Sequence, residues 1–214
     1  MTNQNLVIEF NEKKYTFSTR SLVLYPIGSF ILAVLIIQFF ELPINIWLHE
    51  IIAKQSAFFI NLLFNLGAEV EQNSNTIYPW IIRIPESVTV TMSSGCAGIH
   101  AISIFTSIII FIPHSKDPKT SKDIVWRKTV DIILTIAFIY IFNIFRIVVI
   151  LYLYHLGYDW IMIHDSLANL SAVIAVHVFI FLFCNKLVPE WYISLYYTGK
   201  ILFSHVKLKI RKKS

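Results

Sequence analysis

The stretch IILTIAFIYIFNIFRIVVILYL, residues 132–153, decides the fold, because Arg146 is its only charged residue. A helix that crosses a bilayer needs about 20 mostly apolar residues, and this stretch is long enough. The whole chain has the same character: 56% of its 214 residues are hydrophobic and 14% are charged, against roughly 45–50% and 25% in a typical soluble domain. These values indicate an integral membrane protein and argue against a soluble enzyme, a disordered chain or a collagen-like fibre.

Three further stretches are predicted to cross the bilayer. Residues 22–40 and 95–113 carry no charge, and residues 160–184 carry only Asp165, near their start. The apolar part of the first stretch is too long for a cleaved signal peptide, and no small-residue cleavage site follows it, so we expect a retained helix. The predicted fold class is therefore an all-α integral membrane helix bundle with about four transmembrane helices, in a single membrane domain over residues 1–214.

The basic residues predict the orientation of this bundle. Lys and Arg number three in residues 1–20, five in 114–131 and seven in 185–214, but only two in 41–94 and 154–159 together. Positive charge favours the cytoplasmic side of a membrane, so both termini of this multi-pass protein of the cell membrane are predicted to be cytoplasmic. The basic tail could be a nucleic-acid patch, but beside a span it is more simply expected to face anionic lipid.

The outer segment 41–94 is predicted to hold an interfacial helix and a short β-hairpin. Apolar residues recur at helical spacing over Leu42–Leu66, which is typical of a helix that lies at the membrane surface. A fifth span is the alternative, and Glu50 and Lys54 in the middle of the segment disfavour it. Further on, turn-forming residues and the alternation Val88–Thr91 favour a hairpin that leads directly into the second span.

Three polar side chains are predicted to lie at one depth near the outer face. Cys96 begins the second span at its outer end. Arg146 lies about 21 Å into the third span, which places it in the outer leaflet of a hydrocarbon core about 30 Å thick. His164 lies at the outer end of the fourth span. A thiol, a guanidinium and an imidazole from three helices can therefore meet.

Each of these residues also has a plainer interpretation. A lone cysteine in a membrane helix is usually a small packing residue, and Cys184, at the cytoplasmic end of the last span, illustrates that case and is too far from Cys96 for a disulfide. Arg146 could be a snorkelling anchor, and His164 with its neighbour Asp165 could be an ordinary interfacial pair. The joint occurrence of the three types favours a shared site.

Together the three side chains can carry out cysteine-dependent acyl transfer. The thiolate is the nucleophilic form of cysteine, and its ordinary pKa of about 8.5 leaves little thiolate at neutral pH. Arg146 can stabilise that thiolate or the oxyanion of a tetrahedral intermediate, and His164 can act as acid and base. His100 is the second candidate for the base, because a residue four positions after Cys96 would share its helix face.

The sequence resembles the exosortase/archaeosortase family of membrane transpeptidases over roughly residues 55–170. The resemblance rests on the run from NLLFNLGAEVEQ to VTVTMSSGCAGI, on FNIFRIVVI and on the IHD element. It implies that Cys96 in CAGI is the nucleophile, that Arg146 is the arginine of an N-x-x-R motif that begins at Asn143, and that His164 is the third catalytic residue. His100, Asn143 and Asp165 are expected to be supporting residues at most.

The resemblance also implies the substrate. Such an enzyme recognises exported proteins that end in a short motif, a transmembrane helix and a basic cluster, cleaves near the motif and transfers the new carboxyl end to an acceptor, often a lipid. The chain departs from many relatives in having four predicted spans where they have about eight. It also has alanine after the cysteine where others have serine.

Two other classes of function remain open. The same Cys and His could transfer an acyl chain between lipid and protein, and a non-catalytic assembly or transport protein could use Arg146 as a counter-ion for its ligand. No metal or cofactor is expected, because the sequence has no metal-ligand spacing and no glycine-rich phosphate loop. The motif that is recognised, the acceptor and the source of the chain do not follow from the sequence.

Overall fold

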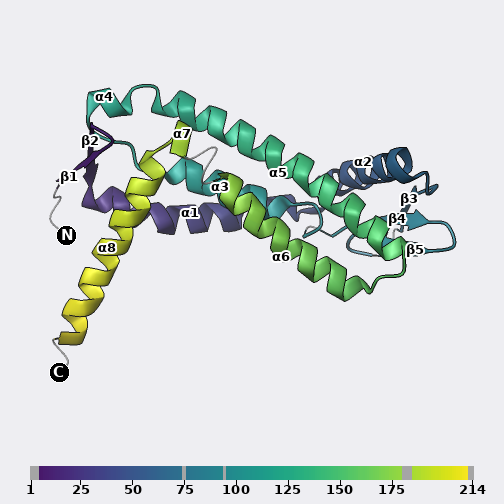
Figure 1. Ribbon diagram of the computed structural model, residues 1–214. Helices are drawn as coiled ribbons and strands as arrows, with labels where there is room; N and C mark the ends of the chain where they lie inside the picture. Colours follow the sequence, from purple (N-terminus) through teal and green to yellow (C-terminus); the bar gives the residue numbers. More distant parts are fainter. Residues whose placement is uncertain (1–4, 74–75, 94, 180–184, 212–214) are drawn as a thin grey trace. The chain divides into compact units, whose positions relative to one another are not determined.

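The computed structural model describes residues 5–73, 76–93, 95–179 and 185–211, without the side chains of Val88, of Asn185 and of residues 202–211. It consists mainly of helices, with two small antiparallel sheets (Figure 1). The elements, in chain order, are β1 (Asn5–Phe10), β2 (Lys13–Ser18), α1 (Thr19–Phe40), the 3-10 turn η1 (Pro43–Asn45), α2 (Trp47–Phe64), β3 (Glu69–Gln72), β4 (Trp80–Ile84), β5 (Val88–Thr91), α3 (Ile99–Phe111), α4 (Pro118–Ser121), α5 (Ile124–His155), α6 (Trp160–Val178), α7 (Asn185–Leu187) and α8 (Glu190–Arg211).

Among the described residues, three helices are long and apolar enough to cross a membrane: α1, α5 and α6. They correspond to the first, third and fourth predicted spans and support a helical membrane protein. The end of the fourth predicted span, including Cys184, lies outside the described residues. The second predicted span corresponds to α3, which has 13 residues and is thus only about 20 Å long.

The second predicted span does not begin as a helix at Gly95. Residues 95–98 form a turn, and α3 begins at Ile99. The reason is the backbone of Gly98, whose φ of +70° is outside the helical range. Cys96 therefore lies in the turn before α3 and not on the helix itself.

The outer segment contains a helix and a sheet, as predicted, with one more strand than expected. Helix α2 occupies the middle of the predicted amphipathic segment. The predicted hairpin is present as β4 and β5, in register from Ile81 opposite Thr91 to Ile84 opposite Val88. Strand β3 pairs with the other edge of β4 and completes a sheet of order β3-β4-β5.

The chain divides into two compact units, which are described separately. The first comprises Met1–Ala33, Ile104–Thr135 and Val178–Ser214. It contains a hairpin of β1 and β2 that the sequence analysis assigned only to the cytoplasmic N-terminus. Its strands bury Ile8, Tyr15 and Phe17 against α1 and α8, and this burial stabilises the hairpin, which would be marginal alone.

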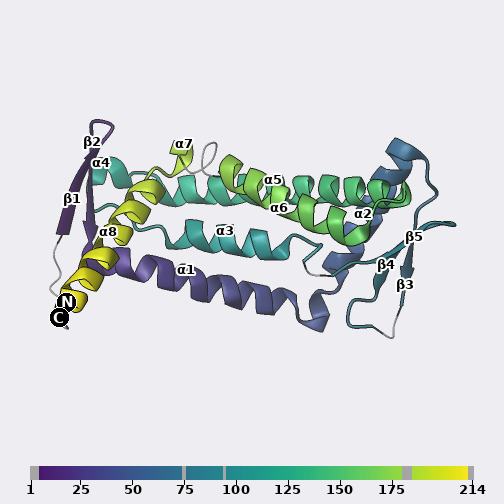
Figure 2. The same ribbon diagram turned by 60° about the horizontal axis from the view of Figure 1, so that its bottom comes forward.

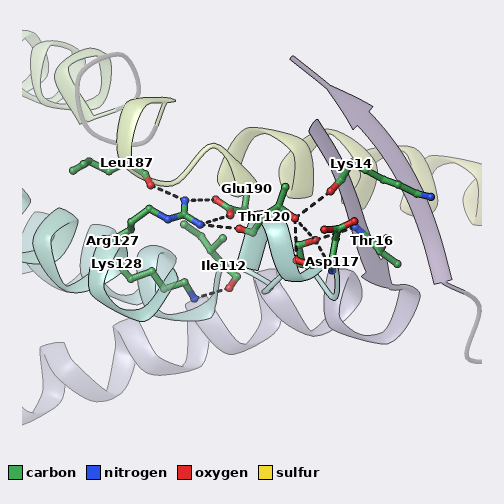
Figure 3. A network of polar contacts seen from close by, with 10 residues as sticks. Lys14, Thr16, Ile112, Asp117, Thr120, Arg127, Lys128, Leu187 and Glu190 are labelled. Atoms are coloured by element: carbon green, nitrogen blue, oxygen red, sulfur yellow. Dashed lines mark hydrogen bonds and ion pairs between the residues drawn. The ribbon is translucent and has the colours of Figure 1, made fainter. Parts of the chain in front are cut away.

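Buried ionic groups connect the helices of this first unit (Figure 3). The Arg127 guanidinium donates two hydrogen bonds to the Glu190 carboxylate, at 3.1 and 2.8 Å. It also donates to the carbonyl oxygens of Thr120 and Leu187. Because a buried carboxylate is costly unless it is paired, Arg127 and Glu190 tie the start of α5 to the start of α8.

Lys128 caps the C-terminal end of α3 in the same unit (Figure 3). Its ammonium group donates to the carbonyl oxygens of Ile110 and Ile112, at 2.9 and 2.6 Å. Carbonyls in the last turn of a helix have no partner within the helix, and a cation there also interacts favourably with the helix dipole. In this unit α1 approaches α3 closely at Gly28, where a Cβ would overlap the Phe111 ring.

The second unit comprises Val34–Ser103 and Ile136–His177. Figure 2 shows α2 and the three-stranded sheet beside the C-terminal end of α5, where the chain turns into α6. Its core contains side chains from each of these parts, including Ile60 of α2, Ile82 of β4 and Leu151 of α5. The residues predicted for the site all belong to this unit.

Candidate active site

The Cys96 turn is fixed in place by α5. The side-chain amide of Asn143 donates a hydrogen bond of 2.6 Å to the Cys96 carbonyl oxygen. The Ala97 N–H donates to the Ser93 carbonyl oxygen at 3.1 Å and closes the turn. A Cβ at Gly98 would lie only 3.1 Å from the Asn143 side chain, so both its positive φ and this close approach require glycine.

The Cys96 thiol forms no disulfide bond. Cys96 is partly exposed and is a free cysteine. The Ser93 hydroxyl donates a hydrogen bond of 3.4 Å to its sulfur, which stabilises negative charge there.

Arg146 of α5 lies beside the same turn. One terminal nitrogen, Nη2, donates to the Gly95 carbonyl oxygen at 3.4 Å, and the guanidinium is close enough to Cys96 for a Coulombic interaction with a thiolate. Within the described residues, Arg146 Nε is buried and has no hydrogen-bond partner. Because such an unpaired donor is costly, it fits an arginine that receives an anionic oxygen during a reaction.

His164 of α6 lies in one pocket with Cys96 and Arg146, and neighbouring side chains hold its ring in place. Its ring stacks on the Trp160 indole, with centroids 5.2 Å apart and an interplanar angle of 27°. Its Nδ1 lies 3.3 Å from a carboxylate oxygen of Asp165. When Nδ1 carries the proton and donates it to this carboxylate, Nε2 is left as the basic nitrogen.

These three predicted residues line one small pocket. Cys96, Arg146 and His164 contribute to its wall, together with Trp160 and with Val90 and Met92 from the end of the sheet. The cavity of about 10 Å³ is close to the minimum for one water molecule. A substrate must therefore reach the thiol from the surface, since the pocket has no room for more than the reacting atoms.

His100 does not line this pocket. Its side chain is exposed, and its Nε2 lies 3.7 Å from a carboxylate oxygen of Glu41. The expectation that His100 shares a helix face with Cys96 is wrong, because the Gly98 turn separates Cys96 from the helix that carries His100. The geometry therefore favours His164 over His100 as the partner of the thiol.

Three contributors to the site were missed by the sequence analysis. Ser93 contacts the sulfur, and Trp160 supports His164 from one helical turn away; the spacing of four residues could have indicated the second contact. His49 of α2 is buried, stacks on Tyr78 and lies 3.2 Å from the Met92 carbonyl oxygen through Nδ1. Burial lowers the pKa of His49, so it is a neutral support for the chain that leads to Cys96.

A larger, apolar cavity of this unit lies elsewhere. It has a volume of about 550 Å³ and lies between α2 and α5, where the Tyr140 hydroxyl donates to Gln55 at 2.6 Å. Its wall has no nucleophile and no titratable pair, so it offers no chemistry of its own. Among the described residues no group of three His, Cys, Asp or Glu side chains could hold a metal ion.

The fold and the site define a class: a helical membrane protein that carries a free thiol, a guanidinium and an imidazole around one pocket. The model of the transmembrane exosortase family matches residues 16–184, which is most of the chain. The protein therefore belongs to the exosortase family. A comparison with curated proteins and a comparison with solved structures each returned no match.

Proposed function

We propose that this protein is a cysteine-dependent membrane transpeptidase that processes exported proteins. The observation that carries the proposal is that Cys96, Arg146 and His164, which come from a turn and two different helices, line one pocket. Exosortase family membership supports a role in protein sorting. Structural packing alone does not require three such reactive groups to share a wall.

The proposed reaction begins with attack of the Cys96 thiolate on the carbonyl carbon of a peptide bond in the substrate. Arg146 stabilises the thiolate and then the oxyanion of the tetrahedral intermediate, since its buried Nε–H is free to donate. The C–N bond breaks, and His164 gives a proton to the departing amine. A thioester to Cys96 remains, and the carboxy-terminal segment leaves.

The second half of the reaction releases the enzyme. The neutral His164 takes a proton from an incoming nucleophile, which attacks the thioester carbonyl. The C–S bond breaks, Cys96 is regenerated as thiolate, and the new carboxyl end is joined to the acceptor. We propose a membrane lipid as the acceptor, and as substrate an exported protein with a carboxy-terminal motif, a transmembrane helix and a basic cluster.

We further propose that the site opens on the extracytoplasmic face. The predicted outer segments 41–94 and 154–159 flank the pocket, since the sheet leads into Cys96 and the α5–α6 connection leads into His164. The basic segments that favour the cytoplasm are near the termini and around α4. A substrate anchored by its own helix would then present its cleavage motif at the level of the thiol.

The experiment is to express the protein with an exported protein of the same genome that ends in such a motif, helix and basic run. Processing is followed by a gel shift and the product end by mass spectrometry. Cys96→Ala is expected to abolish processing while its level and membrane insertion match wild type. Cys184→Ala is the matched control and should process normally.

Retained processing by the Cys96 variant would exclude the thioester mechanism. Mass spectrometry separates the proposal from the acyltransferase alternative, because transpeptidation shortens the substrate at its carboxy-terminal end. An acyl transfer would add mass and leave the polypeptide intact, and a transport or assembly protein would leave both substrate ends unchanged.

A further inference from the structure

Strand β5 is an edge strand that ends next to the candidate active site. The sheet has the order β3-β4-β5, so among the described strands β5 pairs only with β4. The chain then continues from Thr91 through Met92 to the Cys96 turn. Edge strands expose a row of backbone donors and acceptors, which is a template for pairing with another extended chain.

The pairing pattern tells which backbone groups of β5 face outward. The Met92 N–H donates to the Trp80 carbonyl oxygen at 2.9 Å, so these two residues form a hydrogen-bonded pair. In an antiparallel ladder such pairs alternate with pairs whose N–H and C=O groups point away from each other. Thr89 and Thr91 occupy the alternate positions, so their backbone groups point away from β4.

These outward groups are unused in the part of the chain that the structure describes. No backbone or side-chain hydrogen bond to the N–H or C=O groups of Thr89 or Thr91 is present there. Both residues are exposed, in contrast to Val90 between them. The outer edge of β5 is therefore available for two pairs of hydrogen bonds to an extended peptide.

Alternate side chains at the end of β5 and just after it line the pocket. Val90 and Met92 line the same wall as Cys96, Arg146 and His164. Side chains of an added strand would alternate in the same way as those of β5, so every second one would lie on the side of this pocket. Strand β5 and the thiol therefore border the same pocket.

We propose that the outer edge of β5 binds the cleavage segment of the substrate polypeptide as an added β-strand. The inference rests on the proposed function, and it adds how the substrate is held. Hydrogen bonds from Thr89 and Thr91 align the peptide backbone, and the alternate side chains that face the pocket supply the selectivity. This pairing brings an otherwise mobile peptide bond to the thiol in a fixed orientation, which accelerates the attack.

The test removes a single outward donor. Thr91→Pro, and separately Thr89→Pro, eliminates an N–H that β4 does not use, and proline is tolerated at such positions of an edge strand. The ring also blocks the approach of a partner strand. Processing of the co-expressed substrate is expected to fall at least about fivefold in each variant, within the range for loss of one hydrogen bond. Thr91→Ala keeps the donor and should retain much more processing than Thr91→Pro.

The matched control is Gln72→Pro on β3, at the opposite edge of the same sheet. The Asn73 N–H donates to the Pro79 carbonyl oxygen, which places the Gln72 N–H outward by the same alternation. Gln72→Pro should process the substrate as wild type does, with an equal level in the membrane.

Normal processing by both Thr89→Pro and Thr91→Pro would overturn strand addition while leaving the thiol mechanism intact. An equal loss in Gln72→Pro would also overturn it, since the effect would then come from the sheet as a whole. The proposed function fails by a different result, which is processing by Cys96→Ala.

Discussion

His164 and His100 have contrasting surroundings, and these predict different consequences of removing each imidazole. His164 lines the pocket with the thiol, whereas His100 is exposed next to Glu41. Because a general acid–base group contributes roughly 10²- to 10⁴-fold to a rate, His164→Ala should lower processing at least about 100-fold. His100→Ala should change it far less.

The measurement is the initial rate of substrate processing, with Cys96→Ala as the zero point. A trapped substrate–enzyme adduct in His164→Asn, detected by its loss on treatment with hydroxylamine, would identify failure of the second step. The assignment of His164 is wrong if the His100 variant is the inactive one.

Gly98 is the residue at which the backbone and the site depend on each other. Gly98→Ala must place a Cβ at φ +70° and 3.1 Å from Asn143. A left-handed alanine costs about 1–2 kcal/mol, and the contact displaces the amide that holds the Cys96 carbonyl. We expect a lower thermal stability in detergent and a loss of processing of about tenfold or more.

Gly199→Ala in α8 is the control for this prediction. Nothing in the described part of the chain lies within 4 Å of a Cβ at Gly199, and alanine is favoured over glycine within a helix. Its stability should equal or exceed that of wild type. Equal behaviour of the two variants would contradict the role given to Gly98.

The sequence predicted which side chains share the pocket better than it predicted the local backbone around them. The known rise per residue of a helix predicts how deep each residue of a span lies in the membrane. This depth predicted that Cys96, Arg146 and His164 lie at one level. Depth says nothing about rotation around a helix or about a turn before it. The prediction that Cys96 and His100 share a helix face was therefore wrong, because the positive φ of Gly98 places Cys96 in a turn before the helix.

The link between α5 and α8 predicts how the first unit responds to loss of a charge. Glu190 is almost fully buried, with 1% of its side chain exposed, against 24% for Arg127. Arg127→Ala leaves this carboxylate without its partner, which typically costs about 3–5 kcal/mol. The midpoint of thermal unfolding in detergent should fall accordingly.

A double variant tests whether this loss of stability comes from the unpaired charge. Arg127→Leu combined with Glu190→Leu removes both charges and should recover a large part of the stability lost in Arg127→Ala. A cost below about 1 kcal/mol for Arg127→Ala would show that the pair behaves like an exposed one.

Helices were predictable from the sequence where one pattern of apolar residues dominated a segment. Uniform apolarity located α1, α5 and α6, and the amphipathic pattern located α2. The hairpin of β1 and β2 was missed because its turn, Asn11 and Glu12, lacks glycine although both residues have positive φ. Its strands also carry charged residues that favoured a cytoplasmic tail. Burial in tertiary packing, which local sequence does not report, stabilises it.

At the scale of the whole molecule, the number of membrane crossings depends on α3. The hydrocarbon core is about 30 Å thick, and α3 alone spans only about 20 Å at 1.5 Å per residue. The turn before it and the residues up to Ser115 extend its reach, and Lys128 satisfies the last carbonyls of this short helix. We therefore expect α3 to cross, as the four-span topology requires.

Single cysteines in a Cys96→Ala, Cys184→Ala background test this topology with a membrane-impermeant maleimide. With four crossings, Ile77→Cys and Leu156→Cys react from the outside of intact cells, and Lys119→Cys reacts only after the membrane is opened. If α3 does not cross, Lys119 lies on the same side as Ile77, and the side of Leu156 is reversed. All three positions are exposed. A failure to label therefore means that the membrane separates the cysteine from the reagent, and not that the cysteine is buried in the protein. Labelling of Lys119→Cys and Ile77→Cys from the same side would exclude the four-span arrangement.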